Sequence, residues 1–126
     1  MYNKISVVSI PVTDQQASKS FYTNMLDCKV IEEVPFGSNG DAKLWIQLQL
    51  PGVETTLSLV NWIPQMPPGS LQGVVLTTDD IAKTHTELKK RGLVISDIDH
   101  QPYGSEATFS DPDGNGWILQ QTAPGH

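Results

Sequence analysis

The chain has 126 residues, and its 8 Lys and Arg against 14 Asp and Glu give a formal net charge of −6 at pH 7. This balance argues against a nucleic-acid partner, because a phosphate backbone attracts concentrated positive charge. Hydrophobic residues make up 38% of the chain, which is enough for a packed core. No apolar run approaches the roughly 20 residues that a membrane span needs, and residues 1–6 lack the apolar stretch of a signal peptide. We therefore expect a cytoplasmic protein with no membrane partner.

The hydrophobic patterns predict the same order of elements twice. In each half a short β-branched strand leads into a helix, and three more strands follow. The first half has these elements at residues 5–12, 15–26, 29–34, 42–50 and 54–62. The second half has them at residues 71–77, 80–91, 93–98, 103–110 and 116–121. A Pro-rich connector, residues 63–70, separates the halves, so we expect a single domain of two βαβββ modules, about 1–62 and 71–123.

Both predicted helices have recognisable ends. Asp14 is the candidate N-cap of the first helix, Asp79 or Asp80 caps the second, and Gly92 follows the last turn of the second. In the first helix, spacing predicts an inward side of Ala17, Phe21, Tyr22 and Met25 and an outward side of Gln16, Ser18, Lys19 and Asn24.

Alternation gives each predicted strand two different faces. One face is aliphatic and suits packing against the helices; in residues 42–50 it holds Leu44, Ile46, Leu48 and Leu50. The other face mixes aromatic, amide and charged side chains. A solvated surface is one interpretation of that face, but its Trp and aliphatic residues favour a cup for a small organic ligand. The residues expected to line the cup are Trp45, Gln47, Gln49, Ser58, Val60, Trp62, Glu106, Ile118 and Gln120, with Tyr103 at its rim.

The sequence DPDGNG at residues 111–116 is the sharpest local pattern. The spacing of Asp111, Asp113 and Asn115 resembles that of a calcium loop, but the twelfth position is Thr122 where a bidentate Glu is required. We therefore interpret the segment as a hairpin turn between the last two strands.

Few other side chains are candidates for metal binding or nucleophilic catalysis. The histidines are too far apart in the sequence to form a recognisable metal pair, and we expect surface positions for His85, His100 and His126. Cys28 has only Lys29 as a cationic neighbour, so we expect a buried, unreactive thiol. Neither a nucleotide-binding glycine motif nor a serine-hydrolase elbow occurs.

Three short sequences occur within the doubled pattern: IPVTD at 10–14, FYTNML at 21–26 and FSDPDGNGWILQ at 109–120. Together they resemble the vicinal oxygen chelate superfamily, which includes glyoxalase I, extradiol dioxygenases, and fosfomycin and bleomycin resistance proteins. The resemblance implies an α+β fold in which two βαβββ modules curl into an incomplete barrel around a cleft. In small members a homodimer commonly completes this barrel.

The superfamily's metal chemistry depends on His and Glu side chains that project from the strands into the cleft. At the matching positions this chain has Val7, Ser58, Gly73 and Ile118. Only Ser58 carries a side-chain oxygen, and a divalent ion needs several donors, so the resemblance implies no metal and no cofactor here. Metal-free members of the bleomycin resistance type sequester a drug unchanged.

We therefore expect a metal-free, homodimeric protein that sequesters a small aromatic or cationic ligand. In this interpretation Trp45 and Trp62 stack on the ligand and Glu106 supplies charge. A glyoxalase-like lyase or isomerase, with a relocated metal or none and with Glu106 as base, stays open as an alternative. A third alternative is an interface protein without a ligand, whose Trp-bearing face a partner chain covers.

Overall fold

The structure, a computed structural model, describes residues 1–38 and 40–125; His126, predicted at the surface, lies outside the described residues. The elements in chain order are β1 (Val7–Pro11), α1 (Gln15–Met25), β2 (Lys29–Phe36), β3 (Lys43–Gln49), β4 (Thr56–Val60), β5 (Val74–Thr77), α2 (Ile81–Lys90), β6 (Asp99–Gln101), β7 (Gly104–Ser110) and β8 (Gly116–Thr122). They form two four-stranded sheets, ordered β1-β4-β3-β2 and β5-β8-β7-β6. The predicted repetition of a βαβββ unit is confirmed.

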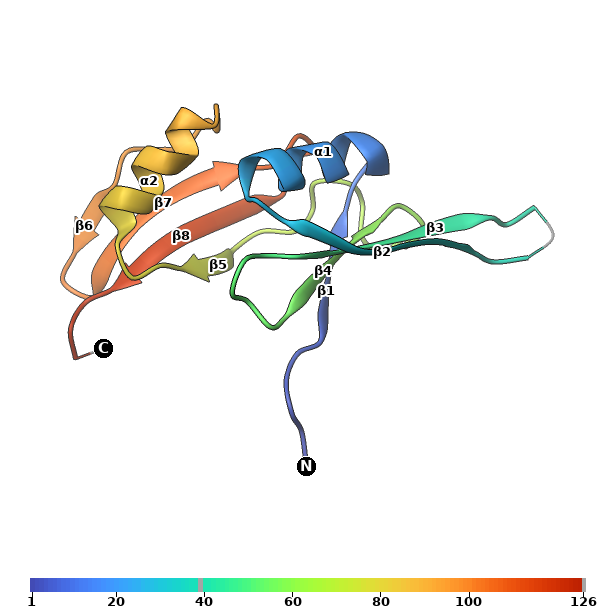
Figure 1. The fold of residues 1–126 in the computed structure, drawn as a ribbon, viewed down its shortest axis with the longest axis horizontal. Helices are drawn as coiled ribbons and strands as arrows, with labels where there is room; N and C mark the ends of the chain where they lie inside the picture. Colours follow the sequence, from blue (N-terminus) through green and yellow to red (C-terminus); the bar gives the residue numbers. More distant parts are fainter. Residues whose placement is uncertain (39, 126) are drawn as a thin grey trace.

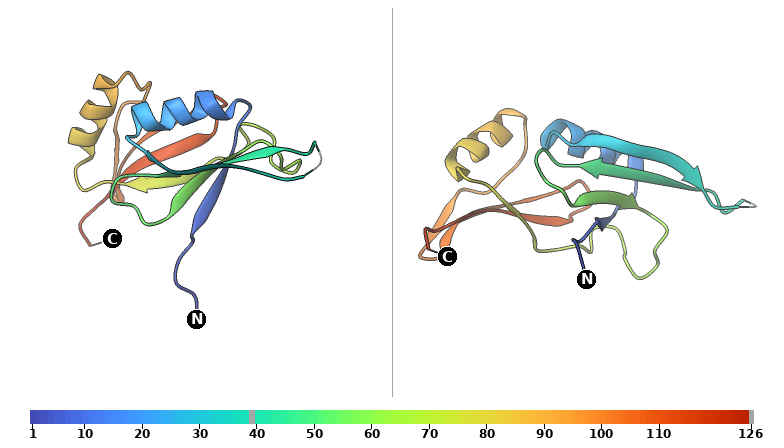
Figure 2. Two further views of the ribbon diagram at one scale, coloured as in Figure 1. Left: turned by 45° about the vertical axis from the view of Figure 1, so that its right-hand side comes forward. Right: turned by 60° about the horizontal axis from the view of Figure 1, so that its bottom comes forward.

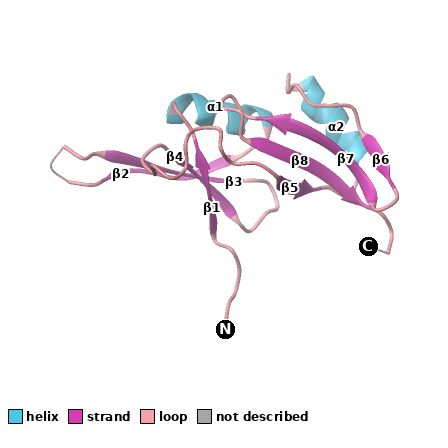
Figure 3. Ribbon diagram, turned by 180° about the vertical axis from the view of Figure 1, so that it is seen from behind, coloured by secondary structure: helices cyan, strands magenta, loops and turns pink. Residues whose placement is uncertain are grey.

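Each sheet is mixed in the same way. The first strand of each module pairs in parallel with the last, and the other neighbours are antiparallel. Both helices lie on one side of the sheets, and the N-terminal segment leaves on the other side (Figures 1 and 2). The far ends of β2 and β3 extend away from the second sheet (Figure 3).

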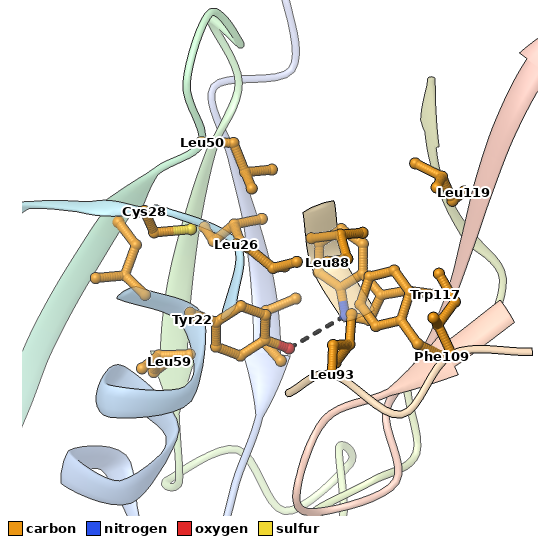
Figure 4. Close-up of a cluster of buried hydrophobic side chains, with 14 of the residues drawn as sticks. Tyr22, Leu26, Cys28, Leu50, Leu59, Leu88, Leu93, Phe109, Trp117 and Leu119 are labelled. Atoms are coloured by element: carbon orange, nitrogen blue, oxygen red, sulfur yellow. Dashed lines mark hydrogen bonds between the residues drawn. The ribbon is translucent and has the colours of Figure 1, made fainter. Parts of the chain in front are cut away.

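The aliphatic strand faces and the buried sides of the helices form one core that both modules share (Figure 4). Ile46, Leu48 and Leu50 are buried in it, as alternation predicts, and Leu44 packs against it. The second module contributes Phe109 and Trp117, whose rings stack at 6.0 Å between centroids. Buried residues of both modules belong to this one cluster, so we expect the two modules to stabilise each other.

α1 faces the core with Phe21, Tyr22 and Met25, as predicted, but two positions of the helix differ from the prediction. Ser18, expected to face solvent, is 1% exposed, whereas Ala17 is exposed. Tyr22 lies one turn after Ser18 and is fully buried. Tyr22 contacts groups of the second module, so the helix turns the Ser18–Tyr22 line inward.

The predicted strand at 93–98 is wrong. Ile95 forms only an isolated bridge to Phe109, and β6 comes after this segment. Beside this bridge, the Thr108 N–H donates to Ser96 Oγ at 2.9 Å, so a side chain takes a place that a backbone carbonyl has in a regular ladder. The Ser96 carbonyl also bonds to His85 Nε2 of α2 at 2.7 Å.

A buried carboxylate, Asp111, joins the two modules. Asp111 is 5% exposed, and its two oxygens accept hydrogen bonds from the Tyr22 hydroxyl (2.8 Å), Asn115 Nδ2 (2.8 Å), and the backbone N–H groups of Asn115 (2.9 Å) and Asp113 (3.0 Å). Trp117 Nε1–H donates in turn to the Tyr22 oxygen at 3.1 Å (Figure 4). Four charge-assisted bonds compensate for burying the carboxylate.

The predicted hairpin at 111–116 does connect β7 and β8, and it also reaches the first module. Asn115 Nδ2 donates to the Pro11 carbonyl of β1 at 2.8 Å, and the Thr13 N–H donates to Asp113 Oδ1 at 3.1 Å. The connector meets the same turn at Gly69, where φ is +81° and a Cβ would collide with the Asp113 carbonyl oxygen. Only glycine suits that position.

Burial and the neighbouring Asp111 carboxylate both raise the pKa of Tyr22 above its ordinary value of 10.0. The hydroxyl is therefore protonated and able to donate to Asp111.

We expect Tyr22→Phe to lower the free energy of unfolding by about 1–3 kcal/mol, because it leaves buried polar groups of Asp111 and Trp117 without their partner. The measurement is urea denaturation followed by circular dichroism. Tyr103→Phe is the matched control: Tyr103 is 47% exposed, and its change should stay within about 0.5 kcal/mol. Equal losses in the two variants would contradict a special role for the Tyr22 hydroxyl.

Candidate functional site

The face of each sheet opposite the helices is called its outer face below. The strand register shows which alternate residues of each strand lie on the outer face of the first sheet. These residues are Val7, Ser9 and Pro11 of β1, Thr56, Ser58 and Val60 of β4, Lys43, Trp45, Gln47 and Gln49 of β3, and Lys29, Glu32, Val34 and Phe36 of β2. Predicted site residues from β1, β3 and β4 are thus brought together on one surface.

An aromatic cluster of Phe36, Trp45 and Trp62 lies on this outer face. The Trp45 and Trp62 centroids are 6.5 Å apart, and the Phe36 and Trp62 rings meet edge to face at 5.0 Å. Both Trp side chains are half-buried, whereas Phe36 is 39% exposed. The cluster is separate from the buried core, and apolar surface of this kind commonly marks a binding site.

A chain of hydrogen bonds runs beside the cluster. Trp45 Nε1–H donates to Gln47 Oε1 at 3.0 Å, and Gln47 Nε2 donates to Thr56 Oγ1 at 2.8 Å. The Thr56 hydroxyl donates to the Ser6 carbonyl at 2.9 Å. Gln49 differs from Gln47, since its Nε2 donates to the carbonyl of Val53 in the β3–β4 turn at 3.2 Å. Gln47 is therefore held in one orientation on the outer face.

The outer face of the second sheet holds the remaining predicted residues. Glu106 of β7 lies opposite Gln120 of β8 and Asp99 of β6, and Thr108 lies opposite Ile118. Beside Ile118 is an open hollow of about 590 Å³, which Thr108, Val94 and Gln72 also line. Tyr103, expected at the rim, is exposed in the turn before β7.

Within one chain the two groups of predicted residues lie on different sheets. In the described ranges, no strand of one sheet pairs with a strand of the other. A groove of about 520 Å³ does lie between the modules, lined among others by Leu26, Leu50, Leu88, Lys83 and Arg91. It contains helix residues and none of the residues predicted for the cup.

The four positions that match the family's metal ligands do not suit a metal ion. Val7 and Ser58 lie on the first sheet, Ile118 on the second, and Gly73 just before β5. Their side chains offer one hydroxyl oxygen in total. Residues 1–38 and 40–125 contain no group of three or more His, Cys, Asp or Glu placed to hold a metal. A divalent ion therefore finds no adequate donor set at these positions.

Cys28 and His100 lie where the sequence predicts, the first buried and the second at the surface. Cys28 is a buried free thiol, and burial together with Asp27 raises its pKa from 9.0 to about 12, so it is a poor nucleophile. His100 is exposed and bonds through Nδ1 to Ser105 Oγ at 2.7 Å. His85 is half-buried and bonded to the Ser96 carbonyl, a structural contact.

Several residues of the first outer face were not among the predicted cup residues, and they include Phe36, Thr56 and Glu32. Thr56 could have been found by extending the alternation of Ser58 and Val60 backwards. Phe36 and Glu32 could not, because an irregularity in β2 between Val30 and Glu32 changes the face on which the later residues lie.

The profile of the Glyoxalase/Bleomycin resistance protein/Dioxygenase superfamily matches residues 4–119. The chain belongs to this superfamily. Among solved structures it is similar to TnmS3, an antibiotic binding protein from Streptomyces sp. CB03234, with 36% identity and a TM-score of 0.85 over 97% of this chain and 98% of that one. A glyoxalase/bleomycin resistance protein from the same organism has 39% identity and a TM-score of 0.79 over 94% and 100% of the two chains.

The chain is also similar to the uncharacterized protein YetH of Bacillus subtilis (strain 168), with 28% identity over 125 residues, covering 96% of this chain and all of YetH. These similarities span both modules and agree with the α+β fold of the superfamily. None of the described helices is long and apolar enough to cross a membrane.

Proposed function

We propose that this chain binds a small aromatic molecule, of the kind found among antibiotics, and holds it without converting it. The observation that carries the proposal is the cluster of Phe36, Trp45 and Trp62, which lies outside the core beside oriented polar groups. Stacking on such rings contributes about 0.5–1.5 kcal/mol per pair beyond area burial. The similarity to the antibiotic binding protein TnmS3 supports this class of ligand.

The cup is completed by a second copy of the chain in this proposal. The Trp residues and Glu106 lie on different sheets, and both outer faces turn away from the helices (Figure 1). If two chains associate about a two-fold axis, the outer face of the first sheet in one copy can be covered by the outer face of the second sheet in the other copy. Each cleft would then combine Trp45 and Trp62 of one copy with Glu106, Ile118 and Gln120 of its partner.

The absence of conversion is part of the same proposal. It rests on the side chains at the metal-ligand positions, Val7, Ser58, Gly73 and Ile118, which offer a divalent ion too few donors. A lyase or isomerase with Glu106 as base is the alternative that the experiments below test.

We expect near-zero metal per chain after incubation with nickel, zinc, manganese and iron(II), because Val7, Ser58, Gly73 and Ile118 together offer a single oxygen donor. The measurement is metal content by mass spectrometry after desalting. A stoichiometry near one metal per chain would overturn the metal-free proposal and favour the enzyme.

Two variants separate the roles of stacking and charge. At pH 8, N-methylacridinium is a cation and acridine is a neutral molecule of the same ring skeleton. Trp62→Ala should weaken both probes roughly twofold to tenfold, whereas Glu106→Gln should weaken only the cation. Equilibrium dialysis measures each affinity, and Tyr2→Ala, which removes a 93% exposed aromatic ring, is the control. Conversion of a bound compound that Glu106→Gln abolishes would establish the enzyme instead.

We expect a mass of two chains in solution, and loss of the dimer in Val34→Glu, because this places a charge on the covered outer face. Val30→Glu is the matched control: Val30 is on the same strand with similar exposure, 37% against 42%, but its register puts it on the opposite face. Sedimentation equilibrium measures both. A dimer that binds no probe would support the interface protein without a ligand.

A further inference from the structure

We infer that the ligand carries a neutral carbonyl oxygen, which Ser58 and Gln47 bind together on the outer face of the first sheet. This inference rests on the proposed binding function and specifies the ligand's chemistry. It starts from two neighbouring hydrogen-bond donors, each with a hydrogen for which residues 1–38 and 40–125 provide no acceptor.

The chemistry of its two ends fixes the direction of the hydrogen-bond chain through Gln47. Trp45 Nε1–H can only donate, so the Gln47 atom facing it at 3.0 Å must be the oxygen. At the other end the Ser6 carbonyl can only accept, so the Thr56 hydroxyl gives its proton there and accepts from Gln47 Nε2. The amide of Gln47 has no second orientation that satisfies both ends.

This direction leaves Gln47 with a free donor. Its Nε2 carries two hydrogens, and one of them goes to Thr56 Oγ1. Within the described part of the chain, the second hydrogen has no acceptor.

Ser58 provides another free donor beside it. Ser58 is 0% exposed, and its Oγ is a buried side-chain oxygen with no hydrogen-bond partner among the described residues. A buried hydroxyl without a partner is unfavourable for folding, and such groups in native proteins call for an explanation. Ser58 and Gln47 are directly opposite each other on neighbouring antiparallel strands, so their Cβ atoms are about 5 Å apart.

Two adjacent N–H and O–H donors suit one oxygen with two lone pairs, which is what a carbonyl offers. A carboxylate suits them less, because Glu32 lies directly across from Gln47 on the same face and would repel it. The aromatic cluster begins at Trp45, the residue that holds Gln47, so the carbonyl would be attached to the ring system stacked there. Because Ser58 is 0% exposed, this contact requires that the atoms covering its hydroxyl move aside when the ligand binds.

The test compares 9-fluorenone with fluorene, which share a three-ring skeleton and differ by a carbonyl against a CH₂ group at one carbon. The carbonyl preference is the ratio of the fluorene Kd to the fluorenone Kd, measured by equilibrium dialysis. Differences in water solubility between the probes cancel when this ratio is compared between variants. We expect Ser58→Ala to reduce the ratio roughly threefold to tenfold, the effect of one hydrogen bond.

Ser18→Ala is the matched control, because Ser18 is equally buried, at 1% exposure, but lies on α1 in the helix layer. It should leave the ratio unchanged. Ser58→Ala should also keep or raise the Tm, since it removes a hydroxyl that has no partner in the ligand-free protein. This combination distinguishes a ligand-binding serine from a structural one.

An unchanged ratio in Ser58→Ala overturns the inference, as does a lowered Tm with an unchanged ratio, which shows a purely structural hydroxyl. If both probes bind wild type but neither variant alters the ratio, the proposed binding function stands and only the carbonyl inference fails. If neither probe binds, the proposed function fails together with the inference.

Discussion

The Asp111 carboxylate is the constraint on which the arrangement of the two modules depends. It is buried, it belongs to the turn of the second module, and one of its partners, Tyr22, comes from the first. Asn115 extends the contact to the Pro11 carbonyl at the end of β1. Directional bonds of this kind fix position and angle, which the shared leucine core alone does not, because hydrophobic contacts are not directional. Any site that combines groups from both modules therefore inherits its geometry from this turn.

In this arrangement one face of each strand packs in the core, and the other face carries the residues of the candidate site. In β3, Ile46 and Leu48 are buried in the core, while the alternate residues Trp45 and Gln47 lie on the outer face. A period of two makes the separation possible, because neighbours in sequence point to opposite sides of the sheet. The same fold can thus hold a metal and its ligands in one family member and a stacked organic molecule in another, since the outer residues alone decide the chemistry.

Features that depend on neighbouring residues could be predicted from the sequence, whereas features that depend on contacts between distant residues could not. Asp14 and Asp80 cap their helices as predicted, because capping depends on a few adjacent residues. Helical spacing placed Phe21, Tyr22 and Met25 correctly toward the core, but it put the polar Ser18 outside, whereas Ser18 is 1% exposed. Residues 93–98 look like a strand by composition, but Ser96 replaces part of the backbone pairing with its side chain. Neither effect leaves a mark on the local pattern.

In the candidate site, the outward-facing residues of β2 could not be predicted from alternation. Alternation from Val30, which pairs with Leu48 on the core side, would place Phe36 among the core residues. The irregularity at Ile31 moves Glu32, Val34 and Phe36 to the outer face, where Phe36 completes the aromatic cluster. One extra residue in β2 therefore adds an aromatic ring, and also an acidic neighbour for Gln47, to a surface that the rest of the sheet had already made polar and aromatic. A shift of this kind changes which side chains a strand presents on the outer face, while the core residues of the neighbouring strands keep their positions.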